Sequence, residues 1–151
     1  MRQRFTDAMK EAMKAGEKRR LSTVRMIQAA LKDKDIEARG AGRGQATEEE
    51  ILALLQKMIK QRQESVAIYD QAGRRELADQ EREEIAVIQG FLPRQMDEAE
   101  TRAAIEAAIA ETGAGSMKDM GKVIGALRGK YAGKMDFAKA SGLVKELLPK
   151  G

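Results

Sequence analysis

The side chains that carry most covalent enzyme chemistry are missing from this 151-residue sequence. It contains no Cys and no His, which excludes thiolate nucleophiles, Ser-His-Asp and Cys-His mechanisms, and zinc sites built on sulfur or imidazole. The four serines lie apart from one another and none lies in a G-x-S-x-G turn. Spacing alone leaves a Ser-Lys pair open, but nothing points to one. We therefore expect no catalytic residue, no metal site and no cofactor.

Carboxylate pairs occur three times, but each falls on a polar face of an expected helix. Acid–base catalysis needs a carboxyl group that is desolvated in a cleft, so solvated helix surface is the better interpretation. The pairs are Asp33 with Glu37, Glu49 with Glu50, and Glu81 with Glu84.

Two glycine-containing stretches lie beside basic residues but match no nucleotide-binding motif. Gly121 and Lys122 lack a glycine five residues earlier and are followed by Val123, so the P-loop pattern fails. The glycines of residues 40–44 do not complete G-x-G-x-x-G and follow no strand.

Positive charge is concentrated at the two ends of the sequence. Residues 1–45 hold twelve Lys or Arg against six Asp or Glu, and residues 113–151 hold eight against three. Residues 46–112 carry eight against fifteen, so the middle is acidic. This distribution fits either a polyanion partner for the ends or ordinary solvated helix faces.

The C-terminal region combines this charge with a regular glycine pattern. Gly121, Gly125, Gly129 and Gly133 recur every four residues, and residues i and i+4 share a helix face. The glycines therefore predict either close helix–helix packing or close approach of a sugar-phosphate backbone. The second interpretation makes these residues a candidate nucleic-acid-binding set: Lys118, Gly121, Lys122, Gly125, Arg128, Lys130, Gly133 and Lys134.

A second basic cluster lies near the N-terminus and has the same two interpretations, a polyanion contact or a solubilising surface. Its members are Lys10, Lys14, Lys18, Arg19, Arg20 and Arg25. Aromatic residues make up only 3% of the chain, too few for base-stacking platforms. An RNA partner would therefore be recognised through its backbone and shape, which suits a folded RNA.

These residues are expected to be positioned by helices throughout, because strong helix formers dominate and apolar residues recur at helical spacing. Gly16, Gly73, the glycines of residues 40–44 and Pro93 should separate these helices. Thr47, Asp97, Ser116 and Asp136 are expected N-caps. The predicted helices cover residues 2–14, 18–37, 47–72, 74–90, 97–112, 117–128 and 136–148.

The expected fold is all-α with two lobes. Residues 1–92 would form an elongated N-terminal lobe in which the two helices of residues 47–92 make a long antiparallel hairpin. Residues 96–149 would form a small three-helix bundle. No apolar run approaches the length of a membrane span and the N-terminus is charged, so we expect a cytoplasmic protein.

Several motifs spread along the sequence resemble those of the YqeY family. Together they cover nearly the whole chain. They are residues 18–27 (KRRLSTVRMI), 56–62 (QKMIKQR), 69–74 (YDQAGR), 91–93 (FLP, where the family has YLP), 113–127 (GAGSMKDMGKVIGAL), 133–136 (GKMD) and 143–148 (LVKELL).

This family is similar to the tail of GatB, which is part of the glutamine-dependent aminoacyl-tRNA amidotransferase. The resemblance implies a helical module that engages tRNA, with Gly121, Lys122, Gly125, Gly133 and Lys134 in the tail motif. It also implies carbon–nitrogen ligase activity with glutamine as amide donor, as a property of a complex whose catalytic parts lie elsewhere. Three functions follow: a non-catalytic tRNA-binding accessory module, an adaptor that docks an amidotransferase or another protein through residues 47–92, and a participant in amide transfer.

Overall fold

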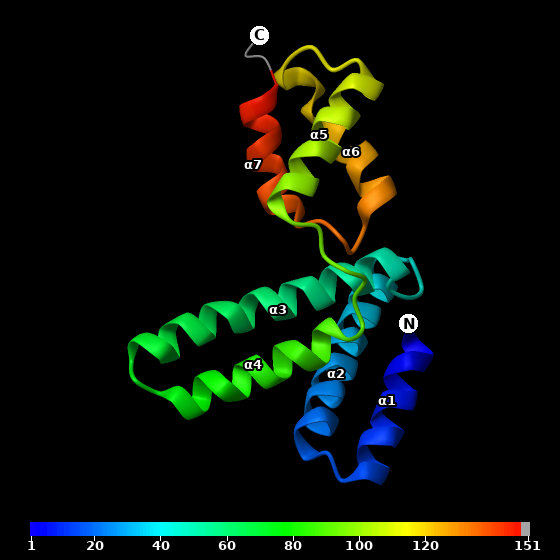
Figure 1. The fold of residues 1–151 in the computed structure, drawn as a ribbon. Helices are drawn as coiled ribbons and strands as arrows, with labels where there is room; N and C mark the ends of the chain where they lie inside the picture. The colour runs from blue at the N-terminus through cyan, green and yellow to red at the C-terminus, as the bar shows by residue number, and fades with distance from the viewer. Residues whose placement is uncertain (149–151) are drawn as a thin grey trace. The chain divides into compact units, whose positions relative to one another are not determined.

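The computed structural model describes residues 1–148, and all regular structure in them is helical, with no strand. The expected all-α class is therefore confirmed. Figure 1 shows the helices in chain order. They are α1 (Arg2–Ala15), α2 (Lys18–Gly40), α3 (Glu48–Gln71), α4 (Arg75–Gln89), α5 (Glu98–Thr112), the 3₁₀ turn η1 (Met117–Asp119), α6 (Met120–Tyr131) and α7 (Phe137–Leu147).

Local sequence explains where several helices begin or end. Thr47 and Asp97 each accept a hydrogen bond from the backbone N–H three residues on, and a glutamate there reaches back to complete a capping box. Asp136 caps α7. Gly16 and Gly113 follow α1 and α5 with φ angles of 69° and 65°, a left-handed conformation that glycine adopts without a Cβ clash.

The chain divides into two compact units, a first unit of residues 1–93 and a second unit from residue 94 onward. The first unit is built around one apolar core to which α1, α2, α3 and α4 contribute. Phe5 and Phe91 meet edge to face in this core, with ring centroids 4.9 Å apart. The buried residues of the cluster are Phe5, Ala8, Val24, Ile27, Leu31, Ala46, Ile51, Leu54, Leu55, Met58, Ile59, Ile88 and Phe91.

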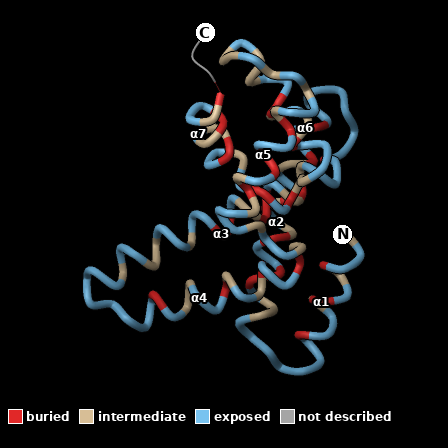
Figure 2. The backbone as a smooth tube through the Cα atoms, turned by 45° about the horizontal axis from the view of Figure 1, so that its top comes forward, coloured by how far each residue is buried: buried red, intermediate tan, exposed pale blue. Residues whose placement is uncertain are grey.

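Helices α3 and α4 run side by side in opposite directions (Figure 1). The residues of α3 and α4 that belong to the core lie at the start of α3 and the end of α4. The remainder of the pair, residues 60–83, is here called its outer part and is largely exposed (Figure 2). Within residues 60–83 only Ala78 is buried. Ile68 and Leu77 remain 65% and 38% exposed, so the outer part of the pair presents apolar side chains to solvent.

The second unit is a smaller bundle of α5, α6 and α7 around its own apolar core. The segment that precedes α5 is joined to the turn after α6 by a hydrogen bond from the Met96 N–H to the Lys134 carbonyl, at 2.8 Å. The buried residues of this core are Ala104, Ile105, Ala108, Val123, Leu127, Met135, Ala140, Val144 and Leu148.

Three local predictions were wrong. Helix α2 continues to Gly40 rather than ending near Glu37, because the fully buried Ala38 belongs to its packed face. Helix α6 passes through Gly129 to Tyr131, because packing of its apolar face outweighs the low helix propensity of glycine. The helical spacing of the apolar residues in α1 also predicts that Met13 faces the core, but Met13 is 54% exposed and the adjacent Ala12 takes the inward position.

Candidate nucleic-acid interface

Helix α6 carries most of the predicted binding set, and its start is fixed by local hydrogen bonds. The Ser116 hydroxyl accepts a hydrogen bond from the Lys118 N–H and caps η1, as the sequence predicted. The Asp119 carboxylate accepts a hydrogen bond from the Gly115 N–H at 2.9 Å. These contacts place η1 and α6 end to end.

The inward and outward faces of α6 are clearly separated. Val123 and Leu127, four residues apart, are at most 1% exposed and anchor the helix in the core. Gly121, Gly125 and Gly129 are exposed, and a Cβ added at any of them would meet no atom of residues 1–148 within 4 Å apart from its chain neighbours and the nearby backbone of its own helix. The glycines therefore line an outward surface, and the alternative that Gly121 and Gly125 serve close helix packing is wrong.

Two lysines flank this glycine surface. Lys118 and Lys122 are exposed, one turn of helix apart. The Lys122 ammonium lies 4.0 Å from the Asp119 carboxylate, with 72% of the side chain exposed. Lys118 makes no ion pair within residues 1–148. Both side chains are therefore available to an anion from outside.

The other two cations of α6 contact neighbouring helices. Arg128 lies over the ring of Phe137 on α7, 5.7 Å from its centroid. Lys130 forms an exposed ion pair with Glu111 of α5 at 2.9 Å. The hydrogen bond to the Glu111 carboxylate raises the pKa of Lys130. Arg128 and Lys130 therefore have partners inside the protein that an external anion would have to replace.

Gly133 and Lys134 form the turn between α6 and α7. Gly133 is buried with a φ angle of 78°, a conformation that disfavours other residues. Its carbonyl accepts a hydrogen bond from the Gln95 side-chain amide at 2.6 Å. The side chain of Lys134 is exposed while its backbone carbonyl holds Met96. Gly133 thus shapes the backbone, and Lys134 adds a cation beside the turn.

The N-terminal basic cluster is divided by the structure into paired and unpaired members. Arg19 forms an ion pair with Glu83 at 3.0 Å, and Arg20 contacts Glu11 at 3.4 Å. Within the described chain, the remaining four are exposed and make no ion pair. These four are Lys10, Lys14, Lys18 and Arg25.

The carboxylate pair Glu81 and Glu84 was expected on a solvated face, and this prediction was wrong. Glu84 is 5% exposed and accepts a hydrogen bond from Arg62 at 3.0 Å. Partial burial and the neighbouring Glu84 raise the pKa of Glu81. Arg62 lies in the apolar spacing of α3, and this cation among core positions was the sequence signal for a buried acidic partner.

Asp35 is a second buried carboxylate that sequence reasoning missed. It is 9% exposed, receives two hydrogen bonds from the Arg2 guanidinium at 2.7 and 2.8 Å, and a third from the Ala46 N–H at 2.9 Å. These hydrogen bonds, with that of Arg2 the largest influence, lower the pKa of Asp35 to about 2. Asp35 thus joins α1, α2 and the segment before α3.

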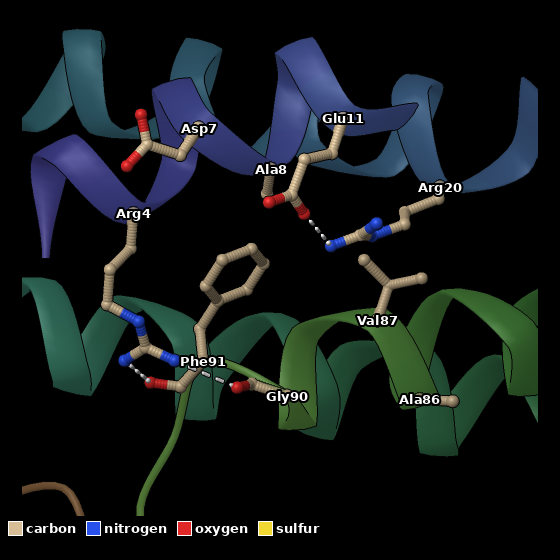
Figure 3. Close-up of a pocket in the computed structure, with 9 residues that line it drawn as sticks. All are labelled: Arg4, Asp7, Ala8, Glu11, Arg20, Ala86, Val87, Gly90 and Phe91. Carbon is tan, nitrogen blue, oxygen red and sulfur yellow. Dashed lines mark hydrogen bonds and ion pairs between the residues drawn. The ribbon is translucent and has the colours of Figure 1, made fainter. Parts of the chain in front are cut away.

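A pocket of about 400 Å³ lies in the first unit between α1, the start of α2 and the end of α4 (Figure 3). Its charged side chains are already engaged by the protein. Arg4 donates to the carbonyls of Gly90 and Phe91, Asp7 accepts from Gln3, and Glu11 contacts Arg20. The pocket therefore offers polar groups that hold helices together rather than a set that converges on a ligand.

No cluster of three or more acidic, Cys or His side chains that could hold a metal occurs in residues 1–148. Over the same residues, no helix has the combination of length and apolar composition needed to cross a bilayer.

Comparison with known proteins identifies the family. The family model described as Yqey-like protein matches residues 2–148. The chain belongs to the YqeY family. The resemblance of the sequence motifs is thereby confirmed at the level of the family. A search of curated proteins gave no match.

Proposed function

We propose that this YqeY-family protein is a non-catalytic, tRNA-binding accessory module related to the GatB tail of the glutamine-dependent aminoacyl-tRNA amidotransferase. The outward face of α6 would contact the sugar-phosphate backbone. Supporting this is the open surface at Gly121, Gly125 and Gly129 beside the exposed Lys118 and Lys122.

The glycines matter because they remove side chains from an exposed helix face. Each glycine within a helix costs roughly 1 kcal/mol relative to alanine, and the space beside these three is empty. Within residues 1–148, no packing contact at these positions explains the cost. A phosphate backbone that approaches the helix closely, with lysine ammonium groups on either side, would explain both the glycines and the cations.

The aromatic residues favour recognition through the backbone rather than through stacked bases. All five rings in the described residues are buried or partly buried. Phe5 and Phe91 pack against each other and Phe137 lies beneath Arg128. Base stacking needs exposed ring faces, so a folded RNA with an ordered backbone is the better partner.

The decisive experiment measures binding of a folded tRNA mixture at two salt concentrations. Wild-type binding should weaken steeply with salt, because each phosphate contact releases counterions. Lys118→Glu with Lys122→Glu should lose binding. The control, Lys139→Glu with Lys145→Glu, makes the same charge change at exposed positions of α7. If the Lys118→Glu, Lys122→Glu protein binds tRNA as tightly as the α7 control protein does, the α6 interface is refuted.

If this protein is an accessory module, a partner enzyme would catalyse the amide transfer. The absence of Cys and His removes the common nucleophiles and general bases of glutamine hydrolysis from this chain. The purified protein should release no ammonia from glutamine. Glutamine-dependent ammonia release by the protein alone would replace the accessory role with an enzymatic one.

A second candidate function is supported by the outer part of the α3–α4 pair. Ile68 and Leu77 are exposed there, outside the core, and an apolar helix face of this kind can dock an amidotransferase or another protein. Ile68→Asp with Leu77→Asp should abolish recovery of a protein partner after nuclease treatment. The control is Ile36→Asp, at a position that is 55% exposed on α2. Unchanged recovery would exclude docking through this surface.

A further inference from the structure

We propose that α2 carries a second RNA-backbone contact, a cationic strip formed by Lys18, Arg25 and Lys32. The proposal rests on the proposed function, because the strip would contact a folded RNA that α6 also contacts. It concerns different residues in a different unit of the chain, and it can therefore fail separately.

The strip follows one face of α2. Lys18, Ser22, Arg25, Ala29 and Lys32 step by four, three, four and three residues, which keeps them in line on a helix. All five are exposed. A rise of about 1.5 Å per residue separates successive cations by about 10 Å. The residues between the cations, Ser22 and Ala29, have small side chains, so no bulky side chain separates neighbouring charges on this face.

None of the three cations is used to hold the fold together. Other cations of the same helix have partners: Arg19 contacts Glu83, Arg20 contacts Glu11 and Lys34 contacts Glu37. In the described part of the chain, Lys18, Arg25 and Lys32 make no ion pair. Arg39, seven residues after Lys32, is also exposed and makes no ion pair in residues 1–148. The cations of α2 that lack an internal ion pair are therefore the three of the strip and Arg39.

The start of α2 places positive charge where it opposes helix stability. Its first turn contains Lys18, Arg19 and Arg20, with no acidic residue and no side-chain cap. The N-terminal end of a helix is itself positive, so these cations are unfavourable there. Helix α3 shows the ordinary solution, with three glutamates in the first turn and a capping box. Arg19 and Arg20 have acidic partners within the protein, so the charge that an anionic partner along α2 would offset is that of Lys18.

Regular cations with small residues between them favour nucleic acid over a membrane. Ile36, 55% exposed, follows Lys32 on the same face, but one such side chain does not make an apolar membrane-binding face. An amphipathic membrane-binding face would bury large apolar side chains beside its cations, whereas the residues between the cations here are Ser22 and Ala29. A duplex limb of a folded RNA presents a rigid row of phosphates that such a strip can follow. Asp33 is the exposed acidic residue beside Lys32.

The test compares three proteins in binding to folded tRNA across a salt series. The strip variant combines Lys18→Gln, Arg25→Gln and Lys32→Gln. The control combines Lys57→Gln, Lys60→Gln and Arg75→Gln, which removes the same charge from exposed positions of α3 and α4 that make no ion pair in residues 1–148. Circular dichroism confirms that each variant is folded.

The strip variant should bind roughly 50-fold more weakly at about 0.15 M salt, because three phosphate contacts are lost. The slope of log affinity against log salt should become shallower by about two to three. The control should bind like the wild type. Asp33→Asn should strengthen binding. If the strip variant binds tRNA as tightly as the control variant does, the proposal is overturned. The same result is expected if the strip binds an acidic protein instead of RNA.

The outcomes also distinguish the two proposed surfaces. Loss of binding in the α6 variant with full binding in the strip variant leaves the proposed function standing and overturns the strip. Loss in the strip variant alone supports the strip and refutes the α6 interface. Failure of the wild type to bind any folded tRNA overturns both.

Discussion

The two units of this YqeY-family protein use their charged residues in different ways. In the first unit, arginines join segments that are distant in sequence: Arg2 binds Asp35, Arg4 binds the carbonyls that end α4, and Arg62 binds Glu84. In the second unit, the ion pairs between helices are exposed, as between Lys130 and Glu111, and Lys118 and Lys122 extend from the surface.

This difference shows that a basic residue cannot be assigned a role from its type alone. Arg62 has a side chain only 14% exposed and its partner Glu84 is nearly fully buried, so the charge stabilises the fold once it is paired. Lys122 is 72% exposed and only loosely paired, so its removal should cost the fold little. Four predictions test this contrast.

The largest effect on stability is expected at the buried ion pair of the first unit. Glu84→Ala leaves the Arg62 guanidinium largely desolvated without its partner, and should lower the free energy of unfolding by about 3 kcal/mol. Denaturant unfolding, with amide hydrogen exchange to localise the change to α3 and α4, measures this. The control Asp70→Ala breaks an exposed pair with Arg82 and should cost less than about 1 kcal/mol.

The combination of Arg62→Met with Glu84→Leu sharpens this prediction. Replacing both members of a buried pair by apolar residues removes the unpaired charge, and most of the stability should return. A double variant as unstable as Glu84→Ala would show that the loss comes from packing at position 84 rather than from the unpaired Arg62.

A smaller loss is expected at Asp35. Asp35→Ala leaves the Ala46 N–H, and in part Arg2, without their acceptor, and should cost about 2 kcal/mol. Urea unfolding measures the change. The control Glu37→Ala, whose exposed ion pair with Lys34 spans 3.4 Å, should be close to neutral. Equal effects at the two positions would mean that Asp35 does not join the segments it contacts.

Acid should weaken both units, and the first more strongly. Asp35 has its pKa lowered to about 2 chiefly by the Arg2 hydrogen bonds, and Glu100 has its pKa lowered to about 2 chiefly by Arg94. Because each folded-state pKa lies below the unfolded value of about 4, the stabilisation is present above pH 4 and is lost as the pH falls towards 2.

Asp35→Asn should remove more of this acid sensitivity than Glu100→Gln, because the Glu100 side chain is 36% exposed and screened by water. Urea unfolding midpoints from pH 2 to 6 measure the slopes. A steeper dependence in the Asp35→Asn protein than in the wild type would contradict the sign of the effect.

The smallest effect on stability is expected at the α6 glycines, and it has the opposite sign. Gly125→Gln enters open space on a helix, so it should stabilise the second unit by less than about 1 kcal/mol while weakening tRNA binding. Gly142→Gln, at an equally open position on α7, should stabilise similarly and leave binding unchanged. Binding and thermal unfolding of both variants measure the contrast.

Several parts of the fold could be predicted because they depend on short-range chemistry. Thr47 and Asp97 cap their helices with hydrogen bonds to residues three positions away, and Gly113 ends α5 through its own φ angle. The candidate site was predictable only as a set of residue types. The sequence placed Gly121 and Gly125 on one face of a helix but left open whether that face points inward or outward.

The sequence by itself determined the helical class, most helix ends and the absence of Cys and His chemistry, because composition and neighbours within a few residues decide these properties. Only the tertiary structure decided that the α6 glycines face solvent, that Glu84 and Asp35 are buried, and that Lys18, Arg25 and Lys32 make no ion pair within residues 1–148. Exposure and pairing depend on which helices meet across long sequence distances, as Arg2 meets Asp35 and Arg62 meets Glu84.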